Sequence, residues 1–267
     1  MKHGTSNVRP LEHLHPDALY AAMQHSRGVI LKHSRAIERN PGDIAAYLAR
    51  AAEYYTLGEI DAAQHDYEAV LARDPGNSAA LSGRGNCRND RGEFDLAIQD
   101  HTLAIKLDPG RAEPYMNRGN AYGNRGFLRD ALVDQTKAIE LDPYESRCYY
   151  NRAVTYERMG KPEETLADCA KAIKLNPAFP EAHFKRANAY AAMGKWEDAL
   201  SSYDAVLTIK PHNVDAMVNA GLMLLRMGKA DRAVTYLSRA AELGDHEARV
   251  AVQKVKAKLL RDSGTAS

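Results

Sequence analysis

The sequence predicts an all-α fold of the α-solenoid class, built from short helix pairs that stack one after another. One observation is a proline every 34 residues, at Pro41, Pro75, Pro109, Pro143, Pro177 and Pro211. A second is a glycine series with the same spacing, at Gly58, Gly92, Gly126, Gly160, Gly194 and Gly228. A fixed period of this size indicates an array of units that pack on their neighbours, rather than one globular core.

Each repeat predicts two antiparallel helices that approach closely. The first helix carries a small residue at its middle, namely Ala51, Gly85, Gly119, Ala153, Ala187 and Gly221 in turn. The second helix does the same with Ala63, Ala97, Ala131, Thr165, Ala199 and Ala233. Glycine at the turn supplies the left-handed backbone that ends the first helix, and proline stops the second. Six full units follow, at 44–77, 78–111, 112–145, 146–179, 180–213 and 214–247.

The two ends depart from the repeat. We expect residues 1–16 to be disordered and residues 17–43 to form a degenerate leading unit whose second helix survives. Gly28 is expected to break or kink that leading unit. Residues 248–261 predict a capping helix with one apolar face and a basic remainder, as the end of a repeat array requires, and residues 262–267 a disordered tail.

Composition excludes several classes of function. The formal net charge is +1, so no global field attracts nucleic acid. There is no apolar stretch of about 18 residues that could span a membrane, and the amino terminus has no apolar secretory run, which favours a cytoplasmic protein. Cys87, Cys148 and Cys169 lack the spacing of a metal or redox site, so we expect buried, reduced thiols and neither metal nor cofactor.

An arginine also recurs in five units, at Arg50, Arg84, Arg118, Arg152 and Arg186. Long basic side chains commonly bury their stems and keep their charged heads in water. We therefore expect these stems to pack between units with the heads at the surface.

The period, the two-helix unit and a tyrosine three residues after the first small position (Tyr54, Tyr122, Tyr156, Tyr190) resemble the tetratricopeptide repeat (TPR) family. The resemblance covers roughly residues 17–260. It implies a right-handed superhelix in which the first helices line a concave groove. It implies little about function, because the fold serves many partners.

The faces of the first helices that the core does not need are the candidate peptide-binding residues. Asparagine recurs there, and its amide can both donate to and accept from the backbone of an extended peptide. Met, Tyr and Phe form a second row able to take side chains, and three cations could meet a carboxylate. The alternative is that the amides only bond between neighbouring helices. The candidates are Asn86, Asn89, Met116, Asn117, Asn120, Asn124, Arg147, Tyr150, Asn151, Arg158, Phe184, Lys185 and Asn188.

No catalytic motif is present, so the sequence predicts a non-enzymatic adaptor that binds an extended segment of a partner protein, with a monomer favoured. One alternative is a self-assembling scaffold that uses its ends or the apolar residues Val218, Leu222 and Leu225, although we expect the capping helix to cover them. A second alternative resembles TPR co-chaperones, which clamp the acidic tail of a chaperone. Asn86, Asn117 and Arg147 fit that clamp, but Ser82 stands where its first lysine belongs and Asn151 where its final arginine belongs.

Overall fold

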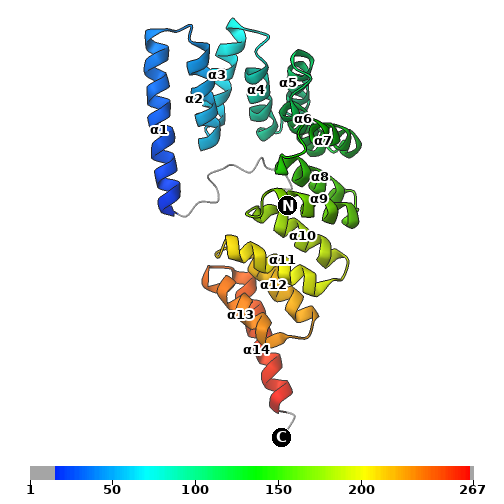
Figure 1. The fold of residues 1–267 in the computed structure, drawn as a ribbon. Coiled ribbons are helices and arrows are strands. Elements are labelled where there is room, and N and C mark those ends of the chain that lie inside the picture. Colours follow the sequence, from blue (N-terminus) through cyan, green and yellow to red (C-terminus); the bar gives the residue numbers. More distant parts are fainter. Residues whose placement is uncertain (1–15, 265–267) are drawn as a thin grey trace. The chain divides into compact units, whose positions relative to one another are not determined.

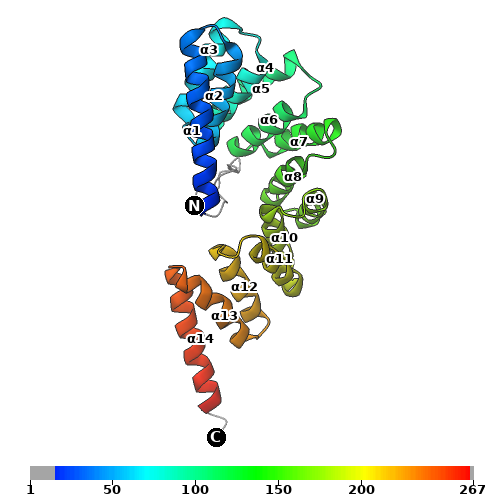
Figure 2. The ribbon, with the colours of Figure 1, turned by 60° about the vertical axis from the view of Figure 1, so that its left-hand side comes forward.

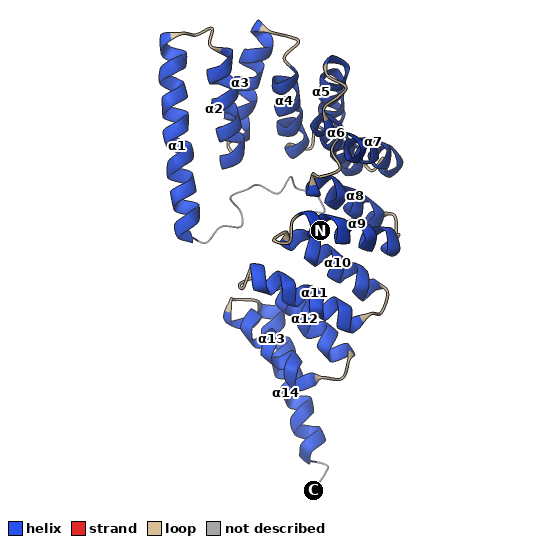
Figure 3. Ribbon diagram, viewed as in Figure 1, coloured by secondary structure: helices blue, strands red, loops and turns tan. Residues whose placement is uncertain are grey.

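The computed structural model describes residues 16–264, and in this range every regular element is a helix (Figure 3). The α-solenoid class is confirmed, because within each of two compact units every described helix packs on the next one along the chain. Two compact units, Met1–Tyr144 (unit 1) and Glu145–Ser267 (unit 2), divide the chain.

Unit 1 begins with a long helix that lies against the first full helix pair (Figures 1 and 2). Two further pairs follow, and the first helices α2, α4 and α6 contact one another in sequence. The helices are α1 (Pro16–Arg39), α2 (Ile44–Leu57), α3 (Ile60–Arg73), α4 (Ser78–Asp90), α5 (Phe94–Leu107), α6 (Ala112–Arg125) and α7 (Leu128–Leu141).

Unit 2 contains three helix pairs and a final helix that packs on the last pair. Its helices are α8 (Ser146–Arg158), α9 (Pro162–Leu175), α10 (Pro180–Ala192), α11 (Trp196–Ile209), α12 (Val214–Arg226), α13 (Ala230–Glu242) and α14 (His246–Gly264).

The turn chemistry is confirmed. All six predicted turn glycines have φ between 70° and 98°, the left-handed region that other residues rarely adopt. Several first helices also begin with a side-chain cap. For example, Asn77 Oδ1 accepts from the backbone N–H of Ala80 at 3.0 Å, and Asn213 Oδ1 accepts from that of Ala216 at 2.7 Å.

Close approach of the paired helices is confirmed as well, because all six predicted small positions on the second helices are fully buried. Gly85 shows why the first helix sometimes needs glycine. A Cβ added there would lie 2.7 Å from Cε1 of His101 on α5, too close for any side chain. His101 is itself fully buried, and neither ring nitrogen has a hydrogen-bond partner in the described part of the chain.

The expectation for the recurring arginines is wrong in one respect: their heads are not free at the surface. In four repeats the guanidinium makes two hydrogen bonds of 2.7–3.0 Å to an aspartate sixteen residues later, on the second helix. The aspartates are only 1–6% exposed. Because burying an unpaired carboxylate is costly, each aspartate needs the positive charge of its arginine. The pairs are Arg50–Asp66, Arg84–Asp100, Arg118–Asp134 and Arg152–Asp168.

The ends differ from expectation in detail. The helix α1 runs through Gly28 without a break, and the space around Gly28 is open, so nothing there forces a kink. Residues 262–264, expected to be disordered, continue α14. Likewise Pro16 already belongs to α1. The rest of the predicted disordered termini, residues 1–15 and 265–267, lies outside the described residues.

Replacing Asp134 with Ala should lower the free energy of unfolding by about 3 kcal/mol, because it leaves the Arg118 guanidinium without its counter-charge between two helices. Urea unfolding followed by circular dichroism measures this. The matched control is Glu113→Ala, which breaks the exposed Arg111–Glu113 pair and should cost less than about 1 kcal/mol. Equal losses in the two variants would contradict the structural role of the buried pair.

Stability should also depend on pH through His101. Burial lowers the pKa of His101 to about 3, whereas an unfolded chain has the ordinary value of about 6.5. The unfolded state therefore binds more protons below pH 6.5, and His101 should contribute a loss of about 2 kcal/mol between pH 7 and pH 5. The change His101→Gln, which places at 101 the residue found at 135, should flatten the pH profile of urea midpoints over this range. A parallel profile for wild type and variant would refute the assignment.

Candidate functional site

The first candidate face, on α4 and α6 of unit 1, carries the predicted asparagines. Part of this row is structural, because Asn124 Nδ2 donates to Asn89 Oδ1 at 3.1 Å and so ties α6 to α4. Asn89 is only 5% exposed. These two amides serve the contact between neighbouring helices, which is the alternative that the sequence left open.

Other polar groups on the same two helices have no such role. Ser82 Oγ and Asn86 Oδ1 are buried and have no hydrogen-bond partner among residues 16–264. Asn117 and Asn120 are each 6% exposed, and their side chains make no hydrogen bond to any described residue. Buried polar groups in native proteins are nearly always paired, so an unpaired set on one face is unusual. We call these four residues the unit 1 polar face.

Met116 lies on the same helix, but it is only 6% exposed and belongs to the core. Its exposed fraction equals that of Asn117 and Asn120, but its thioether is only a weak hydrogen-bond acceptor.

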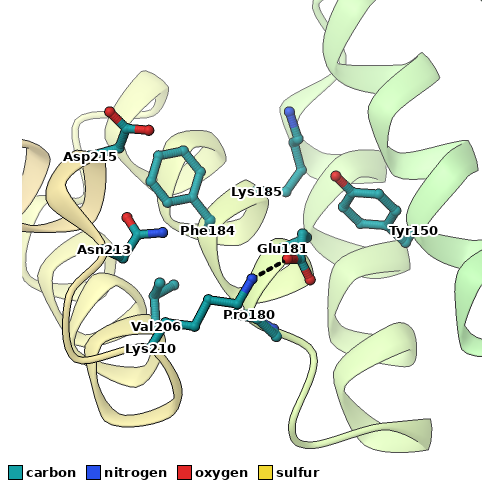
Figure 4. A pocket seen from close by; sticks show the side chains of 9 residues that line it. All are labelled: Tyr150, Pro180, Glu181, Phe184, Lys185, Val206, Lys210, Asn213 and Asp215. Atoms are coloured by element: carbon teal, nitrogen blue, oxygen red, sulfur yellow. Dashed lines mark hydrogen bonds and ion pairs between the residues drawn. The ribbon is translucent and has the colours of Figure 1, made fainter. Parts of the chain in front are cut away.

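The second candidate site is a pocket of about 200 Å³ in unit 2 (Figure 4). It is smaller than the roughly 300–1,000 Å³ typical of small-molecule sites, a size that suits one side chain better than a cofactor. Two of the predicted aromatic residues and the predicted lysine line it. The lining residues are Tyr150, Pro180, Glu181, Phe184, Lys185, Val206, Lys210, Asn213 and Asp215.

A second aromatic ring supports each aromatic wall of the pocket. Phe179 lies behind Tyr150 with a centroid distance of 5.0 Å, and Tyr203 meets Phe184 edge-on at 5.5 Å. Tyr203 is held in turn, because its hydroxyl donates to Asn188 Oδ1 at 2.6 Å. Asn188, a predicted ligand contact, is thus engaged inside the protein.

Both lysines of the pocket are already paired. Lys185 Nζ lies 2.6 Å from a Glu157 carboxylate oxygen, and Lys210 Nζ lies 2.6 Å from one of Glu181. Burial raises the pKa of the Tyr150 hydroxyl above its ordinary range, and the nearby Glu181 carboxylate raises it further. Tyr150 therefore stays a neutral hydroxyl at physiological pH.

Three predicted residues on α8 stand outside this pocket. Arg147 is exposed, and its guanidinium pairs with Glu145 at 3.1 Å. Arg158 is exposed, and Asn151 is half-buried. The structure does not gather the three cations Arg147, Arg158 and Lys185 around one point of this pocket, because only Lys185 lines it.

The predicted binding residues do not include six of the lining residues: Pro180, Glu181, Val206, Lys210, Asn213 and Asp215. Lys210 and Asn213 lie in the connection between α11 and α12, so a search restricted to first-helix faces could not find them. Glu181 and Asp215 occupy the second position of their repeats, a signal that was available in the periodic alignment.

The apolar sixth repeat is only partly covered. Val218 and Leu225 pack against the core cluster that includes Leu224 and Leu237, and α14 contributes to the same cluster. Leu222 stays 43% exposed, so the expected cover by the capping helix does not extend to it.

The described residues contain no group of three or more His, Cys, Asp and Glu side chains placed to hold a metal ion. The three cysteines are free and buried, and burial raises the pKa of both Cys87 and Cys169 to about 12. Thiols with such a pKa are protonated and poorly nucleophilic. Across residues 16–264 no helix is both long enough and apolar enough to span a membrane.

Stability measurements can separate structural from spare asparagines. Asn188→Ala should lower the free energy of unfolding by about 1–3 kcal/mol, because it strands the buried Tyr203 hydroxyl. Asn117→Ala removes no hydrogen bond to a described residue, so it should change the free energy of unfolding by less than about 0.5 kcal/mol. Urea midpoints for the two variants test this, and a larger loss for Asn117→Ala than for Asn188→Ala would show that the assignment is reversed.

Comparison with known proteins agrees with this architecture. Several solved structures have folds similar to that of this chain. MamA, known from a crystal structure, has 27% sequence identity to this chain. The match covers 62% of this chain and 96% of the MamA chain, with a TM-score of 0.57. PilF of Pseudomonas aeruginosa is 20% identical over 80% of this chain and 97% of its own, with a TM-score of 0.68. A chain of the APC/C hetero-tetramer Cut9–Hcn1 is 17% identical over 89% of this chain and 48% of its own, with a TM-score of 0.75.

No curated protein sequence matches the chain. Models of the tetratricopeptide repeat match residues 48–112, 146–179 and 184–248, which together make up more than half of the sequence. Members of this family are in general non-catalytic scaffolds that bind protein or peptide partners. The chain belongs to the tetratricopeptide repeat family.

Proposed function

We propose that this protein is a non-catalytic adaptor that binds an extended segment of a partner protein along its first helices. The observation that carries the proposal is the unit 1 polar face. It presents hydroxyl and amide groups that the fold itself does not use.

An extended peptide offers one N–H and one C=O per residue, and both need partners when the peptide leaves water. A side-chain amide can satisfy either group. Asn117 and Asn120 are spaced three residues apart on α6, so they lie on one side of that helix and can meet successive backbone groups. This kind of contact reads the backbone and is largely indifferent to the partner's side chains.

The two amides that are hydrogen-bonded to each other also support the proposal. The pair of Asn89 and Asn124 holds α4 to α6 at one end of the polar face, so the spare groups sit on a fixed framework. Binding then requires little ordering of the receptor, which lowers the entropic penalty of association.

The proposal includes the absence of catalysis. Its support is chemical: Cys87 and Cys169 are protonated, and the acidic and basic side chains that line the unit 2 pocket are held in ion pairs, apart from Asp215. A general base or nucleophile needs an activated group close to an open site.

Partner capture tests the proposal. The double variant Asn117→Ala/Asn120→Ala should lose most of the proteins that the wild type recovers from a lysate of its native host, because both backbone-binding amides are gone. Quantitative mass spectrometry of affinity-purified samples measures the loss. Circular dichroism should show unchanged helicity.

The matched control is Gln99→Ala, which removes an exposed amide from α5, a second helix. It should recover the same partners as the wild type. If the double variant recovers them equally well, the polar face is not the binding site.

A further inference from the structure

The unit 2 pocket contains one charged group that the fold leaves unpaired. Asp215, in the first turn of α12, is exposed and makes no hydrogen bond or ion pair with any residue that the structure describes. Figure 4 shows its carboxylate above Asn213 and beside the Phe184 ring.

The other charges cannot serve an incoming anion without a loss. Lys185 and Lys210 are each held in an ion pair of 2.6 Å, and each of these side chains is 18% exposed. An acidic ligand would have to break one of these pairs. With Glu157 included, the immediate surroundings hold three carboxylates and two ammonium groups, a net charge of −1.

The walls suit a long, partly apolar side chain. Pro180, Val206 and the face of Phe184 can pack against methylene groups, and the Tyr150 and Phe184 rings can attract a cation through their π faces. The rings behind them hold both walls in place.

From this juxtaposition we infer that the unit 2 pocket receives a lysine or arginine side chain of the partner segment. The methylene stem lies along the Phe184 ring and the cationic head meets Asp215. The inference rests on the proposed function, since it assumes that a peptide occupies the first-helix face. It adds the chemical class of residue that this peptide carries.

Selection of phage-displayed random dodecapeptides on the purified full chain tests the inference. Wild type should enrich peptides with Lys or Arg at one fixed register, and Asp215→Asn should lose that preference. The matched control is Asp231→Asn, which removes the same charge from the same position of the next helix, α13, outside the pocket.

A selected peptide then gives the quantitative measurement by fluorescence anisotropy. Replacing its basic residue with norleucine should weaken binding to wild type about threefold to fivefold, as expected for a solvent-exposed ion pair. The same replacement should have no further effect on Asp215→Asn. Phe184→Ala should weaken binding of the basic peptide by about tenfold through the lost ring.

The outcomes distinguish a failure of the cation pocket from a failure of the adaptor function. Peptides enriched without a basic residue, or a norleucine effect equal in wild type and Asp215→Asn, would overturn the cation pocket while the adaptor function stands. If wild type enriches no peptide at all, the proposed function fails and the cation pocket fails with it.

Discussion

In four consecutive repeats a guanidinium group on the first helix lies against a carboxylate on the second, and the packing of these four helix pairs depends on this contact. The core between the paired helices is largely alanine, which buries little apolar surface per residue. A bidentate pair adds direction, because two parallel hydrogen bonds fix how one helix lies on the other. Arg118 shows the full arrangement. Its third nitrogen donates to Thr102 Oγ1 of the preceding repeat at 3.0 Å, and the rings of Tyr115 and Tyr122 flank its head at 5.8 and 5.9 Å.

Towards the carboxyl end of unit 2 the polar contact gives way to apolar packing. In the fifth repeat the only side-chain partner of Arg186 among the described residues is a hydroxyl, that of Ser202. In the sixth, alanine stands in place of the arginine and Tyr236 in place of the aspartate, and the tyrosine hydroxyl donates to Asp204 at 2.7 Å. The same part of the chain holds the larger apolar cluster around Met217. The repeats therefore share one geometry with two sources of stability, and a buried charge is present only where its partner is.

The arginine–aspartate pairs do not occupy the outer faces of the first helices. The groups that position the helices lie between the paired helices, while the unit 1 polar face and the unit 2 pocket lie on residues that the ion pairs do not need. The two sites differ in chemistry. Unpaired amides suit a peptide backbone, and an aromatic pocket with one free carboxylate suits a side chain.

The sequence by itself determined the class of fold, the turn glycines and the small positions, because each of these follows from local backbone conformation and a 34-residue period that is present six times. It also marked the first-helix faces. The tertiary structure alone decided what each polar side chain does. Asn120 and Asn188 occupy the same repeat position, yet Asn120 has no hydrogen-bond partner among the described residues and Asn188 accepts from a buried tyrosine. Likewise the arginine series did not reveal its aspartate partners, and the pocket includes Lys210 and Asn213 from the connection between α11 and α12, outside the predicted first-helix faces. Hydrogen bonds and ion pairs depend on distances between helices, and those distances are fixed only when the helices pack.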